Sequence, residues 1–199
     1  MPGPPLYSLL AVPAEPAYVP TMPATLMTAE DLVRANISDK RTELVRGVLV
    51  IREPAGDRHG RVTMNLTIRL GTHVERAAAG QLFAAETGFT LSRAPDTVRA
   101  ADIAFIRRER LPEPISGFPE LAPDLVVEVL SPGDRPGETL TKVGDWLEGG
   151  TRLVWVIDPE RRSARAYRHD GSETSIGEGE QLDGEDVLAG FSCRLDSIL

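Results

Sequence analysis

The chain has 199 residues, of which 41% are hydrophobic and 26% are charged, and its formal net charge is -8 at pH 7. This composition is typical of a soluble globular protein of one domain, and the charge argues against a generally basic surface for nucleic acid. Cys193 is the only cysteine, which excludes an intrachain disulfide and a thiolate-rich zinc site. No run approaches the roughly 18 apolar residues of a membrane span, so we expect a cytoplasmic protein without a membrane segment.

The first 26 residues are rich in proline, because seven of the chain's 16 prolines lie between Pro2 and Pro23. Proline lacks the amide proton that helices and central strands need. We therefore expect a disordered or extended arm over residues 1–26, with an arm laid across a partner subunit as the alternative. Residues 27–199 are expected to form a single domain.

The first half of this domain is predicted to hold a short helix, a hairpin and a long helix. Thr28, followed by two acids, is typical of a capping box that opens a helix through Ala35. Gly47 between aliphatic runs predicts a hairpin. Residues 58–79 predict a helix that ends at Gly80, because residues suited to a buried stripe recur at three- and four-residue steps. They are His59, Val62, Leu66, Leu70, His73 and Ala77.

The second half is predicted to alternate strands with one helix. The run RLVWVID is apolar almost throughout, as in a central strand that is covered on both faces. A helix over residues 137–148 is expected to stop at Gly149-Gly150. Strands are predicted over residues 81–93, 101–108, 124–130, 152–158 and 164–169. The expected fold is therefore α/β, with a mixed central sheet flanked by helices and added β-strands at both ends.

Two acids and one lysine in the second half of the domain are of the types that catalyse metal-dependent hydrolysis. Asp102 lies in the strand-like run ADIAFI, Glu128 lies in the strand-like run DLVVEVL, and Lys142 follows in the predicted helix. Carboxylate oxygens suit magnesium, which polarises a phosphoryl oxygen and activates water, while an ammonium can stabilise charge on the reacting oxygens. These three residues are the minimum set for metal-assisted cleavage of a phosphodiester.

Each of these residues also has a purely structural interpretation. Asp102 could be a strand-edge acid paired with Arg99 or Arg107, because burying an aspartate alone costs several kcal/mol. Lys142 could form a surface ion pair with Glu138, one helical turn before it.

Two further polar residues are left with two interpretations each. Glu43 is either an additional ligand for metal or water on the strand before the long helix, or a strand-end charge. His59 is either a satisfied core or cap histidine, or a contact to a phosphate or the nucleophilic water, since an imidazole can act as a donor or as an acceptor.

These residues resemble the PD-(D/E)XK nuclease superfamily, and more closely its Uma-two branch, a former domain of unknown function. Two departures are visible: Ala101 stands where a proline precedes the first aspartate, and Leu130 replaces the lysine of the E-x-K tripeptide. The resemblance covers roughly residues 27 to 190. The matches are Glu43-Leu44 with Gly47, His59, Asp102, Glu128-Val129-Leu130-Ser131-Pro132, Lys142, and Trp155-Val156-Ile157-Asp158-Pro159.

The resemblance implies a restriction-endonuclease-like fold, a homodimer, and a DNA endonuclease that depends on Mg²⁺ or Mn²⁺. Asp102, Glu128 and the backbone carbonyl of Val129 would bind the metal, and Lys142, relocated to the helix, would orient or activate water. The opposing hypothesis is a catalytically silent binding or structural module that keeps the nuclease fold. A small-molecule hydrolase is disfavoured, because no serine or cysteine has a recognisable nucleophile context.

The last thirty residues carry most of the negative charge. Between Asp170 and Leu199 there are eight acids and one base, Arg194. Such a segment repels a phosphate backbone within about 10 Å at 0.1 M salt. We therefore expect it to lie away from a DNA-facing pocket, capping the sheet edge or contacting a second subunit.

Overall fold

The computed structural model describes residues 26–35, 37, 40–85 and 87–199. The predicted Pro-rich arm lies outside these residues except for Leu26. The described part contains helices α1 (Ala29–Ala35), α2 (Asp57–Ala77) and α3 (Pro136–Glu148), with single 3-10 turns at Arg108–Arg110 and Leu195–Ser197. None of these helices has the length and apolar character that a membrane crossing requires.

The capping box predicted for α1 is confirmed. The Asp31 amide donates to Thr28 Oγ1 at 3.1 Å, and the Thr28 amide donates to Asp31 Oδ2 at 2.9 Å. Both exchanges satisfy amide protons that a helix start leaves without a partner.

The predicted end of α2 is wrong by a few residues. The helix stops at Ala77, and Ala78 takes the left-handed conformation (φ 50°) that closes it. Gly80 instead begins the next strand, where a β-carbon would collide with the Ile106 carbonyl oxygen of the neighbouring strand. Glycine is needed there for close approach of two backbones, not for the helix end. The buried stripe holds from His59 to Leu70 and continues through Val74, whereas Ala77 is exposed.

The larger sheet has six strands in the order β10-β9-β8-β7-β6-β3. Strands β7 and β8 run parallel and are joined by α3, while each other neighbouring pair is antiparallel. The sheet is therefore mixed, as predicted. Its strands are β3 (Gly80–Ala84), β6 (Ile103–Arg107), β7 (Leu125–Val129), β8 (Leu153–Asp158), β9 (Ser163–Arg168) and β10 (Glu173–Gly177).

A smaller antiparallel sheet has four strands in the order β2-β1-β5-β4. The predicted hairpin around Gly47 forms β1 and β2. The segment predicted as one continuous strand region over residues 81–93 is divided, because β3 joins the large sheet and β4 joins the small one. The strands are β1 (Arg41–Val45), β2 (Val48–Arg52), β4 (Gly88–Ser92) and β5 (Thr97–Ala100).

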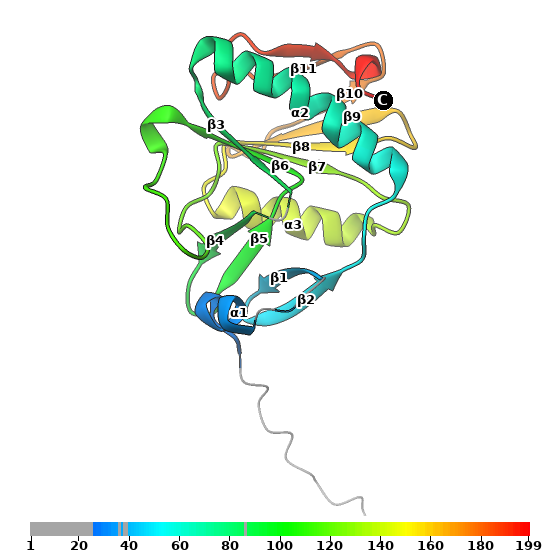
Figure 1. Cartoon of the computed structure of the whole chain (residues 1–199). Coiled ribbons are helices and arrows are strands. Elements are labelled where there is room, and N and C mark those ends of the chain that lie inside the picture. The colour runs from blue at the N-terminus through cyan, green and yellow to red at the C-terminus, as the bar shows by residue number, and fades with distance from the viewer. Residues whose placement is uncertain (1–25, 36, 38–39, 86) are drawn as a thin grey trace, which may run out of the picture.

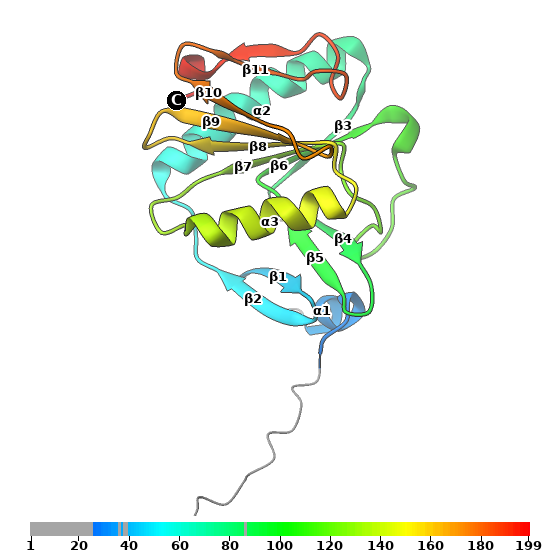
Figure 2. The ribbon, with the colours of Figure 1, turned by 180° about the vertical axis from the view of Figure 1, so that it is seen from behind.

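The large sheet lies between two helices, with α2 on one face (Figure 1) and α3 on the other (Figure 2). Alternate residues of β7 point to opposite faces, so that Leu125, Val127 and Val129 pack with α2 while Val126 packs with Val143 and Trp146 of α3. Burial on both faces explains the nearly continuous apolar runs of β7 and β8.

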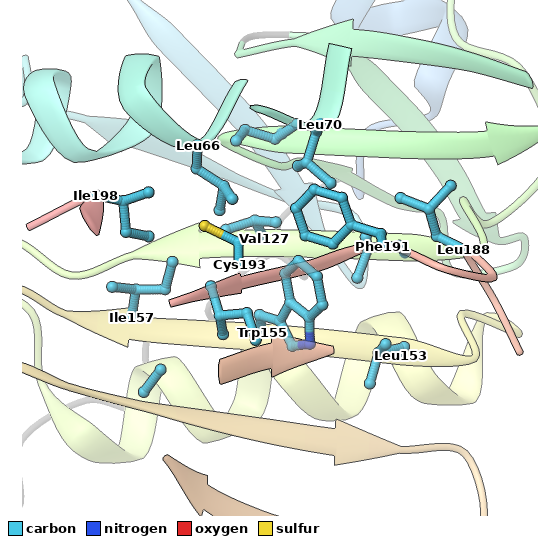
Figure 3. Close-up of a cluster of buried hydrophobic side chains, with 14 of the residues drawn as sticks. Leu66, Leu70, Val127, Leu153, Trp155, Ile157, Leu188, Phe191, Cys193 and Ile198 are labelled. Carbon is cyan, nitrogen blue, oxygen red and sulfur yellow. The ribbon is translucent and has the colours of Figure 1, made fainter. Parts of the chain in front are cut away.

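The acidic C-terminal segment covers the α2 side of the sheet. It contains a small hairpin of β11 (Gln181–Asp183) and β12 (Ser192–Arg194). Phe191, Cys193 and Ile198 point into the same core as Leu66, Leu70 and Trp155 (Figure 3). The acids of this segment therefore lie on the outside of a layer that completes the core.

Candidate functional site

Asp102 lies where the chain crosses from the small sheet to the large one. It occupies a bend between β5 and β6, not the interior of a strand as predicted, and only 4% of it is exposed. Its Oδ2 accepts the Val129 amide at 2.8 Å and His59 Nε2 at 3.0 Å, while Arg41 Nη2 lies 3.3 Å from Oδ1. The bend places this carboxylate beside the end of β7.

The structural partners considered for Asp102 are engaged elsewhere. Arg99 is buried and binds Glu43 and Asp145. Arg107 binds Asp124 near the opposite end of β6. Neither arginine accounts for the Asp102 charge in the described structure, which is met by His59, Val129 and Arg41.

Glu128 projects from β7 toward α3. Its Oε1 accepts Trp146 Nε1 and its Oε2 accepts Lys142 Nζ, each at 2.8 Å. Lys142 and Trp146 are four residues apart, so both reach the sheet from one face of α3. Trp146 is a fully buried core aromatic, and its indole also holds the carboxylate in one orientation.

Lys142 points into the protein, as the nuclease hypothesis requires. Besides Glu128, its Nζ donates to the Ala100 carbonyl at 2.9 Å and lies 3.1 Å from Glu43 Oε1. Glu138, the alternative partner, instead lies near Arg52 and Arg135. The structure thus joins Lys142 to Glu128 and Glu43 and not to its neighbour on the helix surface.

Glu43 is a buried acid at the middle of β1, not an exposed strand-end charge. Its Oε2 accepts Arg99 Nη1 at 2.9 Å and its Oε1 accepts the Ala100 amide at 3.1 Å. Arg99 also donates to Asp145 on α3. Glu43 therefore connects the lysine to a buried network that ties the small sheet to α3.

Two residues of this site, Arg41 and Asp145, were not identified from the sequence. The partners of Arg99 and the hydrogen bond from Trp146 to Glu128 were not foreseen either. Asp145 carried a usable signal, because it directly precedes Trp146 on the buried side of α3. A charged residue in such a position requires a partner of opposite charge. Arg41 carried no local signal, because strand ends often bear arginine.

Burial and neighbouring charges separate the pKa values of the site. For Glu128, burial is the main cause, and the charge of Asp102 adds to it; together they outweigh Lys142 and raise the pKa to about 7. Burial acts on Glu43 in the same sense, but the charges of Lys142 and Arg99 prevail and lower its pKa to about 2.

The other two groups remain charged. Burial opposes ionisation of Asp102, yet hydrogen bonding and charge from His59 and the Val129 amide lower its pKa. Burial also opposes the charge of Lys142, and the Glu128 and Glu43 carboxylates overcome it and raise the pKa of Lys142. The ammonium is therefore a stable positive charge.

The cluster opens into a pocket of about 660 Å³. Four cationic side chains line it: Lys40, Arg41, Arg52 and Lys142. Six carboxylates line it as well: Glu43, Glu53, Asp102, Glu128, Asp134 and Glu138. The formal excess is two negative charges, which one divalent cation would neutralise. Residues 170–199 contribute nothing to the lining, so the acidic segment lies away from the pocket, as predicted.

The donor set fits a hard divalent ion only in part. Across the described residues, no three His, Cys, Asp or Glu side chains gather to hold a metal. Magnesium, however, is usually bound through one or two carboxylates, with waters and substrate phosphates completing its shell. Asp102 and Glu128, with the charge excess of the pocket and the raised Glu128 pKa, fit that mode. That the two carboxylates share one ion stays a prediction.

Comparisons with known proteins agree with this fold. A crystal structure of a protein from Anabaena variabilis, described as a putative nuclease belonging to DUF820, superposes with a TM-score of 0.77 at 16% sequence identity. The similarity covers 86% of this chain and 97% of the other. At this identity it shows the fold alone, which is restriction-endonuclease-like as predicted. No curated protein matches the chain.

The sequence itself matches a family model over residues 29–196, and that family, Uma2, is described as putative restriction endonuclease. The matched range contains every residue of the site described above. Because the match spans more than half of the chain, the protein belongs to the Uma2 family.

Proposed function

We propose that this protein is a magnesium-dependent endonuclease that hydrolyses phosphodiester bonds in DNA. One observation carries the proposal: Asp102, Glu128 and Lys142, which come from a sheet crossing, a central strand and a helix, converge on one pocket. Buried acids with a raised pKa and a specific charged partner in a pocket are typical of functional sites.

Asp102, Glu128 and the Val129 carbonyl would hold the Mg²⁺ or Mn²⁺ ion. The ion would supply polarisation of a phosphoryl oxygen and activation of water. His59 orients Asp102 through the 3.0 Å hydrogen bond, and Trp146 orients Glu128 through the indole N–H. These two donors restrict the rotation of both acids before substrate arrives, which lowers the entropic cost of reaching a reactive arrangement.

Lys142 would act as a fixed positive charge. Its raised pKa means that it keeps its proton, so it would stabilise negative charge on the reacting oxygens through its charge instead of accepting a proton. Glu43 would hold the ammonium in place through the 3.1 Å contact. This assigns Glu43 to positioning and leaves Asp102 and Glu128 as the side-chain ligands.

A plasmid assay tests the proposal. Supercoiled DNA is incubated with the protein in Mg²⁺, Mn²⁺ or EDTA, beside the variants Asp102→Asn and Glu128→Gln. We expect nicked or linear DNA with either metal and no product in EDTA. Asp102→Asn should give at least about a thousandfold less product, and Glu128→Gln at least about a hundredfold less. Product that persists in both variants would assign the activity to a contaminant and reject this site.

The alternative function is a binding or structural module that retains the fold without catalysis. Two observations favour it: Leu130 stands where the family pattern has lysine, and both Glu128 oxygens already accept protein donors. Calorimetric titration with Mn²⁺ separates the two functions. Binding that Asp102→Asn abolishes supports the nuclease, whereas absence of binding together with absence of nicking supports the silent module.

The family resemblance also leads us to propose a homodimer, and the single cysteine is consistent with a reducing cytoplasm. Light scattering coupled to size-exclusion chromatography measures the mass directly. A mass near 21.6 kDa would identify a monomer and reject the dimer.

A further inference from the structure

The two oxygens of Asp102 have different surroundings. Oδ2 accepts two well-formed hydrogen bonds, from the Val129 amide at 2.8 Å and from His59 at 3.0 Å. Oδ1 meets the Arg41 guanidinium at the longer distance of 3.3 Å. Oδ1 is therefore the oxygen that an incoming cation would meet first.

Arg41 is held much more loosely than the other arginine of the site. Its side chain is 24% exposed, against 3% for Arg99. Arg99 donates to Asp145 through two nitrogens and to Glu43 through a third, whereas the Asp102 contact uses one of the five N–H donors that a guanidinium carries. Arg41 can leave Asp102 without breaking a buried network, and Arg99 cannot leave its partners in that way.

The position of Arg41 also suits contact with an anion. Arg41 begins β1 and lies directly across the hairpin from Arg52, and both line the pocket together with Lys40. Of the lining acids, Asp134 comes from the loop before α3 and Glu138 from its first turn. The hairpin side carries Glu43 and Glu53 against three cations, which leaves it one positive charge in excess. A phosphate would therefore be attracted to the hairpin side of the pocket, where a planar guanidinium can bind two of its oxygens.

We propose that Arg41 is an exchangeable cation: it neutralises Asp102 while no divalent ion is bound, and it contacts a substrate phosphate once an ion has taken its place. The inference rests on the proposed function, because it names how that site receives its metal and its phosphate. A divalent ion at Oδ1 would repel the guanidinium, and a partly exposed arginine can respond by rotating toward the hairpin side. The two cations thus compete for one oxygen.

Metal binding measured without any cleavage tests the competition. Calorimetric titration with Mn²⁺ compares the parent with Arg41→Ala, Arg41→Lys and the matched control Arg165→Ala, which removes an arginine from β9 that is 55% exposed and outside the pocket lining. We expect Arg41→Ala to bind Mn²⁺ roughly fivefold more tightly than the parent, since the competing charge is gone. Arg41→Lys and Arg165→Ala should stay within about twofold of the parent.

DNA binding should change in the opposite direction. Fluorescence anisotropy with a cleavage-resistant phosphorothioate duplex in Mn²⁺ should show Arg41→Ala binding several-fold more weakly, with a salt dependence reduced by about one phosphate contact. In EDTA the parent and Arg41→Ala should differ by less than about twofold, because Arg41 then stays with Asp102. Arg41→Lys should lose part of the Mn²⁺-dependent affinity, since lysine lacks the two-pronged geometry.

The outcomes separate this inference from the nuclease proposal. Equal or weaker Mn²⁺ binding by Arg41→Ala, or no Mn²⁺ binding by the parent, overturns the exchange even if plasmid is nicked. Tighter metal binding combined with weaker Mn²⁺-dependent DNA binding supports it even if no plasmid is nicked. A merely structural role for Arg41 would weaken both or change neither.

Discussion

Two buried aspartates flank the same pair of strands, and one is surrounded by arginines while the other opens into a pocket rich in carboxylates. Asp102 immediately precedes β6 and Asp124 immediately precedes β7, and because these strands are antiparallel the two acids lie at opposite ends of the sheet. Asp124 is fully buried and accepts Arg107 Nε at 3.1 Å, Arg110 Nη1 at 2.7 Å and the Arg107 amide at 2.9 Å. Asp102 shares its end of the sheet with Glu128 and with a net excess of carboxylates.

The difference shows that burial of an acid does not by itself identify a functional site. Asp124 follows Pro123 in one of the chain's Pro-Asp dipeptides, yet two arginines neutralise it. Asp102 follows Ala101 and is the acid that opens into the pocket. The balance of charge around an acid, and not the residue before it, distinguishes a binding site from a structural ion pair.

The largest expected effect separates the two aspartates directly. Asp102→Asn should reduce plasmid nicking at least about a thousandfold while the melting temperature changes by no more than a few degrees, because the amide oxygen can still accept the Val129 amide. Asp124→Asn should lower the free energy of unfolding by about 2 kcal/mol, roughly 4 to 8 °C, because two arginines lose their counter-charge. Calorimetry and the nicking assay at 20 °C measure both. An inactive but fully folded Asp124→Asn protein would contradict the comparison.

Removal of the lysine tests whether the open cluster depends on the ammonium that Glu128 and Glu43 share. Lys142→Met should lower the nicking rate at least about a hundredfold. It should also destabilise the protein more at pH 8 than at pH 6, because Glu128 and Glu43 lose a shared positive charge and Glu128 can take up a proton only at the lower pH. The same substitution at Lys40, the chain's other lysine, removes an exposed charge and should reduce activity less than about tenfold. Equal effects of the two would reject the proposed role of Lys142.

The raised pKa of Glu128 makes metal binding depend on pH. At pH 6 most of this carboxyl is protonated, since its pKa is about 7, so an ion must displace the proton. As pH rises toward 7, we expect the Mn²⁺ dissociation constant to fall by up to about tenfold per pH unit. Above pH 7 the dissociation constant should level off. Calorimetry in two buffers of different ionisation enthalpy measures the released proton. Asp124 is already paired, so Asp124→Asn should keep the same profile, whereas Glu128→Gln should flatten it.

The raised pKa of Glu128 also determines how the free energy of unfolding changes with pH. Because the pKa of Glu128 is higher in the folded protein than its ordinary 4.5, folding favours the protonated form. The resulting stabilisation is fully present below about pH 4.5 and is lost as pH rises toward 7. Mn²⁺ should therefore raise the melting temperature more at pH 8 than at pH 5.5. An equal rise at both pH values would contradict the assignment.

The smallest expected effect concerns two buried tryptophans. Trp146 donates its indole N–H to Glu128, whereas Trp155 Nε1 has no hydrogen-bond partner among the described residues. Trp146→Phe should lower nicking about threefold to tenfold and move the midpoint of its pH profile upward, because the carboxylate loses a donor. Trp155→Phe is the matched control, and its midpoint should not move. Equal midpoints in the two variants would show that Trp146 only fills space.

Local patterns in the sequence were sufficient for much of the fold and part of the site. Alternation along β7 is enough to place Glu128 on the face opposite Leu125 and Val127, and the helical period of α3 is enough to place Lys142 one turn before Trp146 on the same side. Both inferences need only the repeat of one element, 2 residues for a strand and about 3.6 for a helix. The faces that these residues occupy are therefore encoded locally.

The partners were decided by tertiary structure. Glu43 meets Arg99 across 56 positions and Arg99 meets Asp145 across 46, and no local period specifies which distant segments become neighbours. Asp102 was placed inside a strand because its flanking residues are apolar, yet the chain changes sheets at that point and turns its carboxylate toward Val129. The sequence by itself thus determined which elements form and which faces they bury, while the meeting of two sheets and α3 decided which charges are neutralised and which remain open to a ligand. The physical reason is that hydrophobic burial follows local patterns, whereas charge compensation depends on contacts between segments far apart in the chain.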